Sequence, residues 1–186
     1  MDFQAALSGH RMAIDAVEAL EEDVQNAVRH LQATFRAGGR VYVCGNGGSA
    51  ADAQHFAAEL TGRYSRDRPG FPAVALTTDT SALTAIGNDY GFDRIYARQL
   101  ESLARTGDCL LALSTSGNSP NIQAAVTAAS QLGVTTLGLL GRDGGPMARM
   151  VDQALIVSAE ETARVQEAHI LILHMLCDAF EDGPCS

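Results

Sequence analysis

A chain of 186 residues, of which 46% are hydrophobic, is long enough to bury the core of one compact domain. Its formal net charge of -9 argues against nonspecific nucleic-acid binding, because phosphate backbones are held by clustered basic residues. All 13 basic residues are Arg, and the absence of Lys excludes a Lys Schiff base and a P-loop Lys. No signal peptide opens the sequence, and no apolar run reaches ~18 residues, the rough minimum for a spanning helix. We therefore expect a soluble, cytoplasmic protein with neither a nucleic-acid nor a membrane partner.

The chain opens with a long predicted helix over residues 2–36. Apolar residues recur at helical spacing from Ile14 to Phe35, and Gly38 and Gly39 follow as a stop signal. So long a helix carries a longer apolar stripe than one small sheet can cover. Residues 1–37 are therefore either an oligomer contact or packed within the chain, and the sequence leaves both interpretations open.

After this segment, short aliphatic runs alternate with helical stretches to the end of the chain. Such alternation predicts an α/β fold, with a parallel sheet covered by helices on both faces and residues 1–186 forming a single domain. Residues 63–72 are expected to form a surface loop. The predicted strands are 41–45, 73–76, 109–114, 134–140 and 154–158; the predicted helices are 49–63, 80–86, 92–105, 120–132 and 161–180.

A Gly-rich turn, Gly45 to Ser49, follows the first predicted strand and runs directly into a helix. Free backbone N–H groups and the helix dipole make such a turn suitable for binding an anion. His55 and Glu59 are four residues apart, so they share one face of this helix. The helix is mostly apolar and is expected to be well buried. A phosphate site and an ionisable pair within two helical turns point to chemistry on a small phosphorylated molecule.

A second polar loop, Ser114 to Ser119, follows the third predicted strand and leads into a helix near Pro120. One hydroxyl would suffice to cap a helix, and this loop has four. Hydroxyls, a Gly and a helix N-terminus together favour a phosphate cradle built from neutral donors. Both of these polar loops directly follow strands, and α/β sheets bind their ligands at the carboxyl ends of their strands.

The C-terminal helix supplies candidate partners for the first ionisable pair. His174 lies inside an aliphatic run, where an unpartnered polar ring would be costly. It is either a core histidine bonded to a backbone carbonyl, or it converges with His55, Glu59 and Gln166 as metal ligand, acid or base. Two histidines and a carboxylate suit Zn²⁺, although an amide oxygen is a less usual fourth ligand.

Two further features carry no chemistry by themselves. The polar patch Thr84 to Gly91 is typical of a helix end followed by a turn. The four cysteines have no CxxC spacing, and Cys44 and Cys109 lie in apolar runs where Cys acts as a small hydrophobe.

Taken together, these segments resemble the sugar isomerase (SIS) domain, and within it the sedoheptulose 7-phosphate isomerases. The resemblance covers nearly the whole chain and rests on five segments in order: Cys44 to Ser49, His55 to Arg63, Gly87 to Gly91, Ser114 to Ser119, and Arg164 to His169. It implies a three-layer α/β/α sandwich with a five-stranded, flavodoxin-like parallel sheet, a homotetramer, and one zinc per subunit. It also implies conversion of sedoheptulose 7-phosphate to D-glycero-D-manno-heptose 7-phosphate, the first step towards nucleotide-activated heptose.

Residue roles are implied in the same way. The resemblance assigns zinc binding to His55, Glu59, Gln166 and His174, and phosphate binding to Ser114, Thr115, Ser116 and Ser119. The implied partner is a phosphorylated seven-carbon sugar. The resemblance assigns contacts with this sugar to Asn46, Gly47, Gly48, Ser49, Glu59, Asn88, Asp89 and Gln166. Some isomerases of the family have Asp three residues before the matching Gln, where this chain has Ala163.

A ketose–aldose isomerisation needs a base near the substrate carbon, an acid for the oxygen, and stabilisation of the developing oxyanion. We assign Glu59 as the base and His174 as the acid, with zinc as a Lewis acid. Because a carboxylate bound tightly to zinc is a poorer base, the metal is expected to shift or release a ligand during turnover.

The alternative function comes from non-enzymatic relatives that bind the bacterial replication initiator DnaA as tetramers. These relatives share the loops, but the positions that match Glu59 and His174 are typically not Glu and His. This chain keeps both residues, which favours the enzyme.

Overall fold

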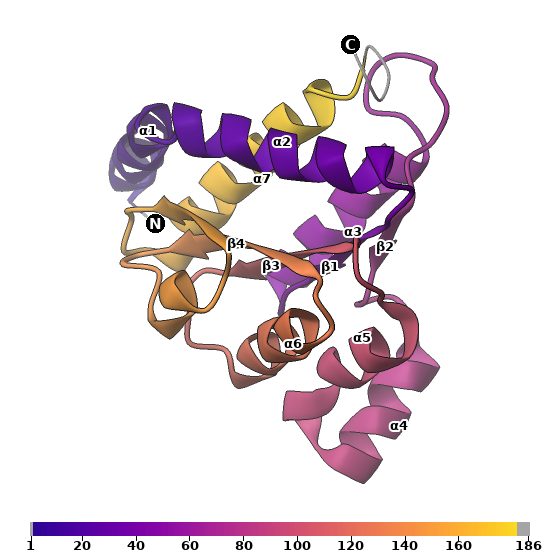
Figure 1. Cartoon of the computed structure of the whole chain (residues 1–186). Helices are drawn as coiled ribbons and strands as arrows, with labels where there is room; N and C mark the ends of the chain where they lie inside the picture. The colour runs from indigo at the N-terminus through magenta and orange to yellow at the C-terminus, as the bar shows by residue number, and fades with distance from the viewer. Residues whose placement is uncertain (1, 182–186) are drawn as a thin grey trace.

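The computed structural model describes residues 2–181 and contains one five-stranded parallel sheet (Figure 1). Its strand order, β2-β1-β3-β4-β5, is the doubly wound order of flavodoxin-like folds, which confirms the predicted class. Each strand lies within about two residues of its predicted position: β1 is Val41–Cys44, β2 Ala73–Ala75, β3 Cys109–Ser114, β4 Thr135–Gly141 and β5 Gln153–Val157.

The two faces of the sheet carry separate cores, because successive strand residues point to opposite sides. Val41 and Val43 pack into one core, and Tyr42 packs into the other. Figure 1 shows the resulting three layers, with helices above and below the sheet. The first core is covered by α1 (Phe3–Glu18), α2 (Glu21–Arg36), α3 (Gly48–Thr61) and α7 (Thr162–Asp178), and the second by α5 (Ala97–Leu103) and α6 (Pro120–Gln131).

The N-terminal segment is two helices, so the prediction of one helix over residues 2–36 is wrong. Helix α1 ends at Glu18, and α2 begins at Glu21 after a tight turn at Ala19 and Leu20. The first turn of α2 is Glu21, Glu22 and Asp23, and acidic residues are stabilised at a helix N-terminus by its dipole. These three acids were the sequence signal for a new helix start.

The region after β2 also differs from its prediction. Helix α4 runs over Thr80–Tyr90 and ends at Gly91, whose φ of 87° is accessible to Gly. The predicted helix 92–105 is a 3₁₀ turn, Phe92–Arg94, followed by α5, and a second 3₁₀ turn spans Pro146–Arg149. None of the α4 residues is buried, and the helix projects from the layers at the lower right of Figure 1.

Cys44, Cys109 and Cys177 are free and buried, while Cys185 lies outside the described residues. Burial raises the pKa of the Cys44 thiol to about 12, and that of Cys109 to the same value with nearby acidic charge contributing. The expectation that Cys44 and Cys109 act as small hydrophobes is therefore confirmed. Among residues 2–181, no helix is both long enough and apolar enough to cross a bilayer.

Candidate active site

The two polar loops meet where the strand order reverses. Strands β1 and β3 are neighbours, and the loops that follow them start α3 and α6. The side-chain amides of Asn46 and Asn121 bridge the loops with two reciprocal hydrogen bonds, each 2.8 Å long. Doubly wound sheets bind ligands in the crevice beyond the carboxyl ends of their strands at such a reversal. The topology therefore places both predicted loops side by side at the carboxyl ends of the strands.

The Gly-rich turn is packed closely against α7. A Cβ atom on Gly48 would lie 2.4 Å from Nε2 of Gln166, so only Gly leaves room for this amide. Gly47 precedes the helix with a φ of 57°, in the region that favours Gly. Ser49 is only 3% exposed, so the structure does not bring this predicted sugar contact to the surface.

The second loop makes hydrogen bonds within itself. The Ser114 hydroxyl accepts a bond from the Gly117 N–H at 3.1 Å and lies 3.3 Å from the Ser119 hydroxyl. Ser114 is buried under the loop, whereas Thr115, Ser116 and Ser119 are partly exposed. Ser119 is the N-cap of α6, and its side chain makes no capping bond. Its hydroxyl lies at the helix N-terminus, a position where backbone N–H groups and the helix dipole favour anions.

A hollow beside the first loop extends towards α4. Asn46, Gly47, Thr77, Thr84 and Tyr96 are among the residues that line it. Asn88 and Asp89 lie in the last turn of α4, are exposed, and bond to each other at 2.8 Å. The structure thus places these two predicted sugar contacts on the projecting helix, outside the lining of this hollow.

A cluster of two histidines and a glutamate joins α3 to α7. His55 Nε2 lies 3.0 Å from Glu59 Oε1 and 3.1 Å from His174 Nε2, and His174 Nε2 lies 4.0 Å from the same carboxylate oxygen. These three residues are a candidate metal-binding group. Zinc–ligand bonds of about 2.0–2.1 Å in a tetrahedral site imply ligand separations of about 3.3 Å, which the observed distances bracket. The donor atoms and their spacing therefore fit a zinc ion.

Gln166, the fourth predicted zinc ligand, lies on α7 with its side chain against the start of α3. Its amide packs against Gly48, which precedes His55 by seven residues, or about 10 Å along α3. Gln166 thus lies at the turn, next to the predicted sugar contacts.

The helix that carries His55 and Glu59 is expected to be well buried, but only part of its surface is. The side chain of His55 is 48% exposed, that of His174 36% and that of Glu59 19%. The core histidine bonded to a backbone carbonyl is His169, whose Nε2 lies 3.1 Å from the Leu140 oxygen. An aliphatic run alone could not show which histidine of α7 faces the core.

Asp52 is a residue of this region that the sequence reasoning did not single out. It lies one turn before His55 on α3, and its Oδ2 is buried with no hydrogen-bond partner among residues 2–181. Burial raises the pKa of the Asp52 carboxyl, and the nearby His55 opposes that shift. The signal in the sequence was its i, i+3 spacing with His55.

Comparisons with known proteins show the family of this chain. The family model of the SIS domain matches residues 8–141. The phosphoheptose isomerase of Trichlorobacter lovleyi is 52% identical over 95% of this chain and 91% of its own length, and that of Helicobacter pylori is 51% identical over 96% and 93%. The chain belongs to the phosphoheptose isomerase family of SIS domain proteins.

Solved structures of phosphoheptose isomerases have the same fold. The protein from Neisseria gonorrhoeae superposes with a TM-score of 0.88 at 47% identity, covering 94% of each chain. The protein from Francisella tularensis gives a TM-score of 0.91 at 38% identity, covering 96% of this chain and 95% of its own. Because these relatives carry the names of isomerases, they favour the enzyme over the DnaA-binding alternative.

Proposed function

We propose that this protein interconverts sedoheptulose 7-phosphate and D-glycero-D-manno-heptose 7-phosphate, the first step towards nucleotide-activated heptose. The observation that carries the proposal is that Nε2 of His174 and Oε1 of Glu59 lie 4.0 Å apart, on helices α7 and α3, which meet at the Gly-rich turn. Membership of the phosphoheptose isomerase family supports the same reaction.

In the proposed complex the phosphate binds at the start of α6. Thr115, Ser116 and Ser119 present partly exposed hydroxyls there, and Ser114 supports the loop from below. The sugar extends from this loop along α3, past Asn46, Gly47, Gly48 and Gln166. Because the phosphate is on C7 and the reacting carbons are C1 and C2, phosphate and chemistry lie at opposite ends of the substrate. The spacing of about 10 Å between Gly48 and His55 along α3 suits such a substrate.

His55, Glu59 and His174 are the proposed zinc ligands, one ion per subunit, because their donor atoms fit a zinc site. When bound, zinc supplies a Lewis acid that polarises the substrate oxygens. The protein residues carry the protons. Glu59 takes a proton from C1, and His174 donates one to the C2 carbonyl oxygen, which gives the enediol. Glu59 then returns its proton to C2 and the C1 hydroxyl proton passes to His174, which gives the aldehyde.

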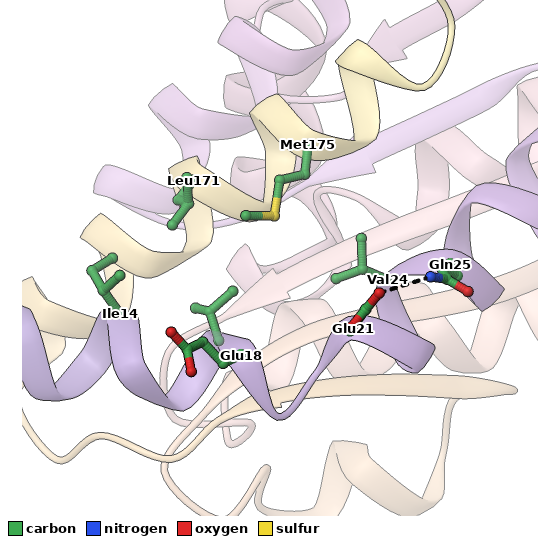
Figure 2. Close-up of a pocket in the computed structure, with 8 residues that line it drawn as sticks. Ile14, Glu18, Glu21, Val24, Gln25, Leu171 and Met175 are labelled. Atoms are coloured by element: carbon green, nitrogen blue, oxygen red, sulfur yellow. Dashed lines mark hydrogen bonds between the residues drawn. The ribbon is translucent and has the colours of Figure 1, made fainter.

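The proposal extends to a cytoplasmic homotetramer of one-domain subunits in which residues 1–37 form an oligomer contact. Figure 2 shows an open groove between α1, α2 and α7. Ile14, Val24, Leu171 and Met175 line it with apolar atoms, and Met175 is 42% exposed. An exposed apolar groove is typical of a surface that another chain covers. Sedimentation velocity tests the assembly, and a monomeric wild type would contradict it.

The test of the activity is an isomerase assay on sedoheptulose 7-phosphate with zinc or with chelator. We expect Glu59→Gln and His174→Asn to lose ~10² or more in rate, the usual contribution of a positioned acid or base. Circular dichroism must show that both variants remain folded. Absence of turnover by folded, zinc-loaded wild type would refute the proposed reaction.

A further inference from the structure

The loop between α3 and β2 holds the last turn of the helix that carries Glu59. Although this loop was predicted to lie on the surface, the side chain of Arg68 is only 3% exposed. Its guanidinium donates hydrogen bonds to the backbone carbonyls of Glu59, at 2.9 Å, and Leu60, at 3.1 Å. A helix leaves its last carbonyls without intrahelical partners, so Arg68 caps the end of α3.

A buried carboxylate beyond the end of α7 holds the same loop. Glu181, whose side chain is 5% exposed, accepts bonds from Nε of Arg68 at 3.2 Å, from the Ser65 N–H at 2.9 Å, and from the Arg66 N–H. Burial raises the pKa of the Glu181 carboxyl, but these hydrogen bonds and the Arg68 charge outweigh it and leave the pKa below its usual value. Arg68 and Glu181 thus join the C-terminal ends of α3 and α7.

Tyr64, immediately before Ser65, lies against the imidazole of His174. The two ring centroids are 5.7 Å apart and the ring planes are tilted by 33°. Within residues 2–181, Nδ1 of His174 has no hydrogen-bond partner, since the bond of this ring is made through Nε2. Metal-binding histidines usually have their second nitrogen bonded, which fixes the ring. Here the ring of Tyr64 packs against one side of the His174 imidazole, and the His55 ring meets the same imidazole at a centroid distance of 5.3 Å.

We propose that Tyr64 is a positioning residue for His174, and that the Arg68–Glu181 pair holds Tyr64 in place. The aromatic face of Tyr64 blocks rotation of a partly exposed imidazole, so Nε2 stays directed at Glu59 and His55. This inference rests on the proposed function, because it takes His174 as a zinc ligand and general acid.

Zinc affinity, measured by competition with a chromophoric chelator, separates positioning from simple packing. We expect Tyr64→Phe, which keeps the ring, to bind zinc like wild type. Tyr64→Leu should bind 10- to 100-fold more weakly, as is usual when the support of a metal ligand is lost. Its kcat should fall more than its KM changes. Glu181→Gln should weaken zinc binding in the same direction, and it decides the question if Tyr64→Leu fails to fold.

The matched control is Phe35→Leu. It removes an aromatic ring from the same core, where Phe35 packs against Phe71 and Phe180, so it should lower stability and leave zinc affinity unchanged. Tyr64→Leu with a lower melting temperature but wild-type zinc affinity would overturn the inference, as would wild-type affinity in Glu181→Gln. A wild type that binds no zinc would instead refute the proposed metal site.

Discussion

His169 should make the stability of this protein fall between pH 7 and pH 5. The imidazole is fully buried and makes one hydrogen bond, to the Leu140 carbonyl, while its Nδ1 has no partner among residues 2–181. Burial, only partly opposed by that bond, lowers the pKa of His169 to about 4 from an ordinary value of 6.5. The folded state thus holds the ring neutral at a pH where the unfolded chain protonates it.

The sign and size of the effect follow from linkage. Above pH 6.5 both states are neutral, and the contribution of the buried ring to stability is fully present. Below that value the unfolded state binds a proton and the folded state does not. The free energy of unfolding therefore falls by about 1.4 kcal/mol for each pH unit. The loss reaches about 2 kcal/mol at pH 5 and levels off below about pH 4, where the folded state also takes up the proton.

The assay is urea unfolding at pH 7 and pH 5, at one protein concentration and with chelator present. His169→Gln keeps a donor for the Leu140 carbonyl but cannot titrate, so its free energy of unfolding should lose about 2 kcal/mol less than wild type over this range. His30→Gln removes an exposed histidine and should behave like wild type. Equal pH dependence in wild type and His169→Gln would refute the reasoning.

The other predictions concern the Gly-rich turn and the thiols. A Cβ atom in Gly48→Ala would displace the Gln166 amide, which is the far end of a flexible side chain. We expect kcat/KM to fall roughly tenfold, which corresponds to the free energy of one lost hydrogen bond. The free energy of unfolding should change by less than about 1 kcal/mol. Unchanged kinetics would argue against a substrate contact at Gln166. Cys44 and Cys109, buried with pKa values of about 12, should resist alkylation at pH 8 until urea unfolds the chain, which peptide mapping by mass spectrometry can check. Labelling of either thiol in the native protein would contradict their burial.

The order of the elements and the positions of both polar loops could be predicted because they depend on local patterns. Apolar runs fix the strands, and Gly45 to Ser49 and Ser114 to Ser119 stand at strand ends whatever the rest of the chain does. The spacing of His55 and Glu59 placed them on one face of a helix without any tertiary information. The break between α1 and α2 was missed because helical spacing continues across it, and only the acids at Glu21 to Asp23 mark it.

Contacts between distant segments were decided by the tertiary structure alone. His55 and His174 are 119 residues apart in sequence, and their meeting depends on α3 and α7 sharing one face of the sheet. Periodicity shows which residues of a helix share a side, but not which neighbour that side meets, so it could not tell the core histidine His169 from the site histidine His174. Likewise, Arg68 falls in the predicted surface loop, and in the structure its side chain is buried beside Glu181. Local sequence patterns are enough to predict the fold class and the chemical groups, and packing decides which of those groups come together.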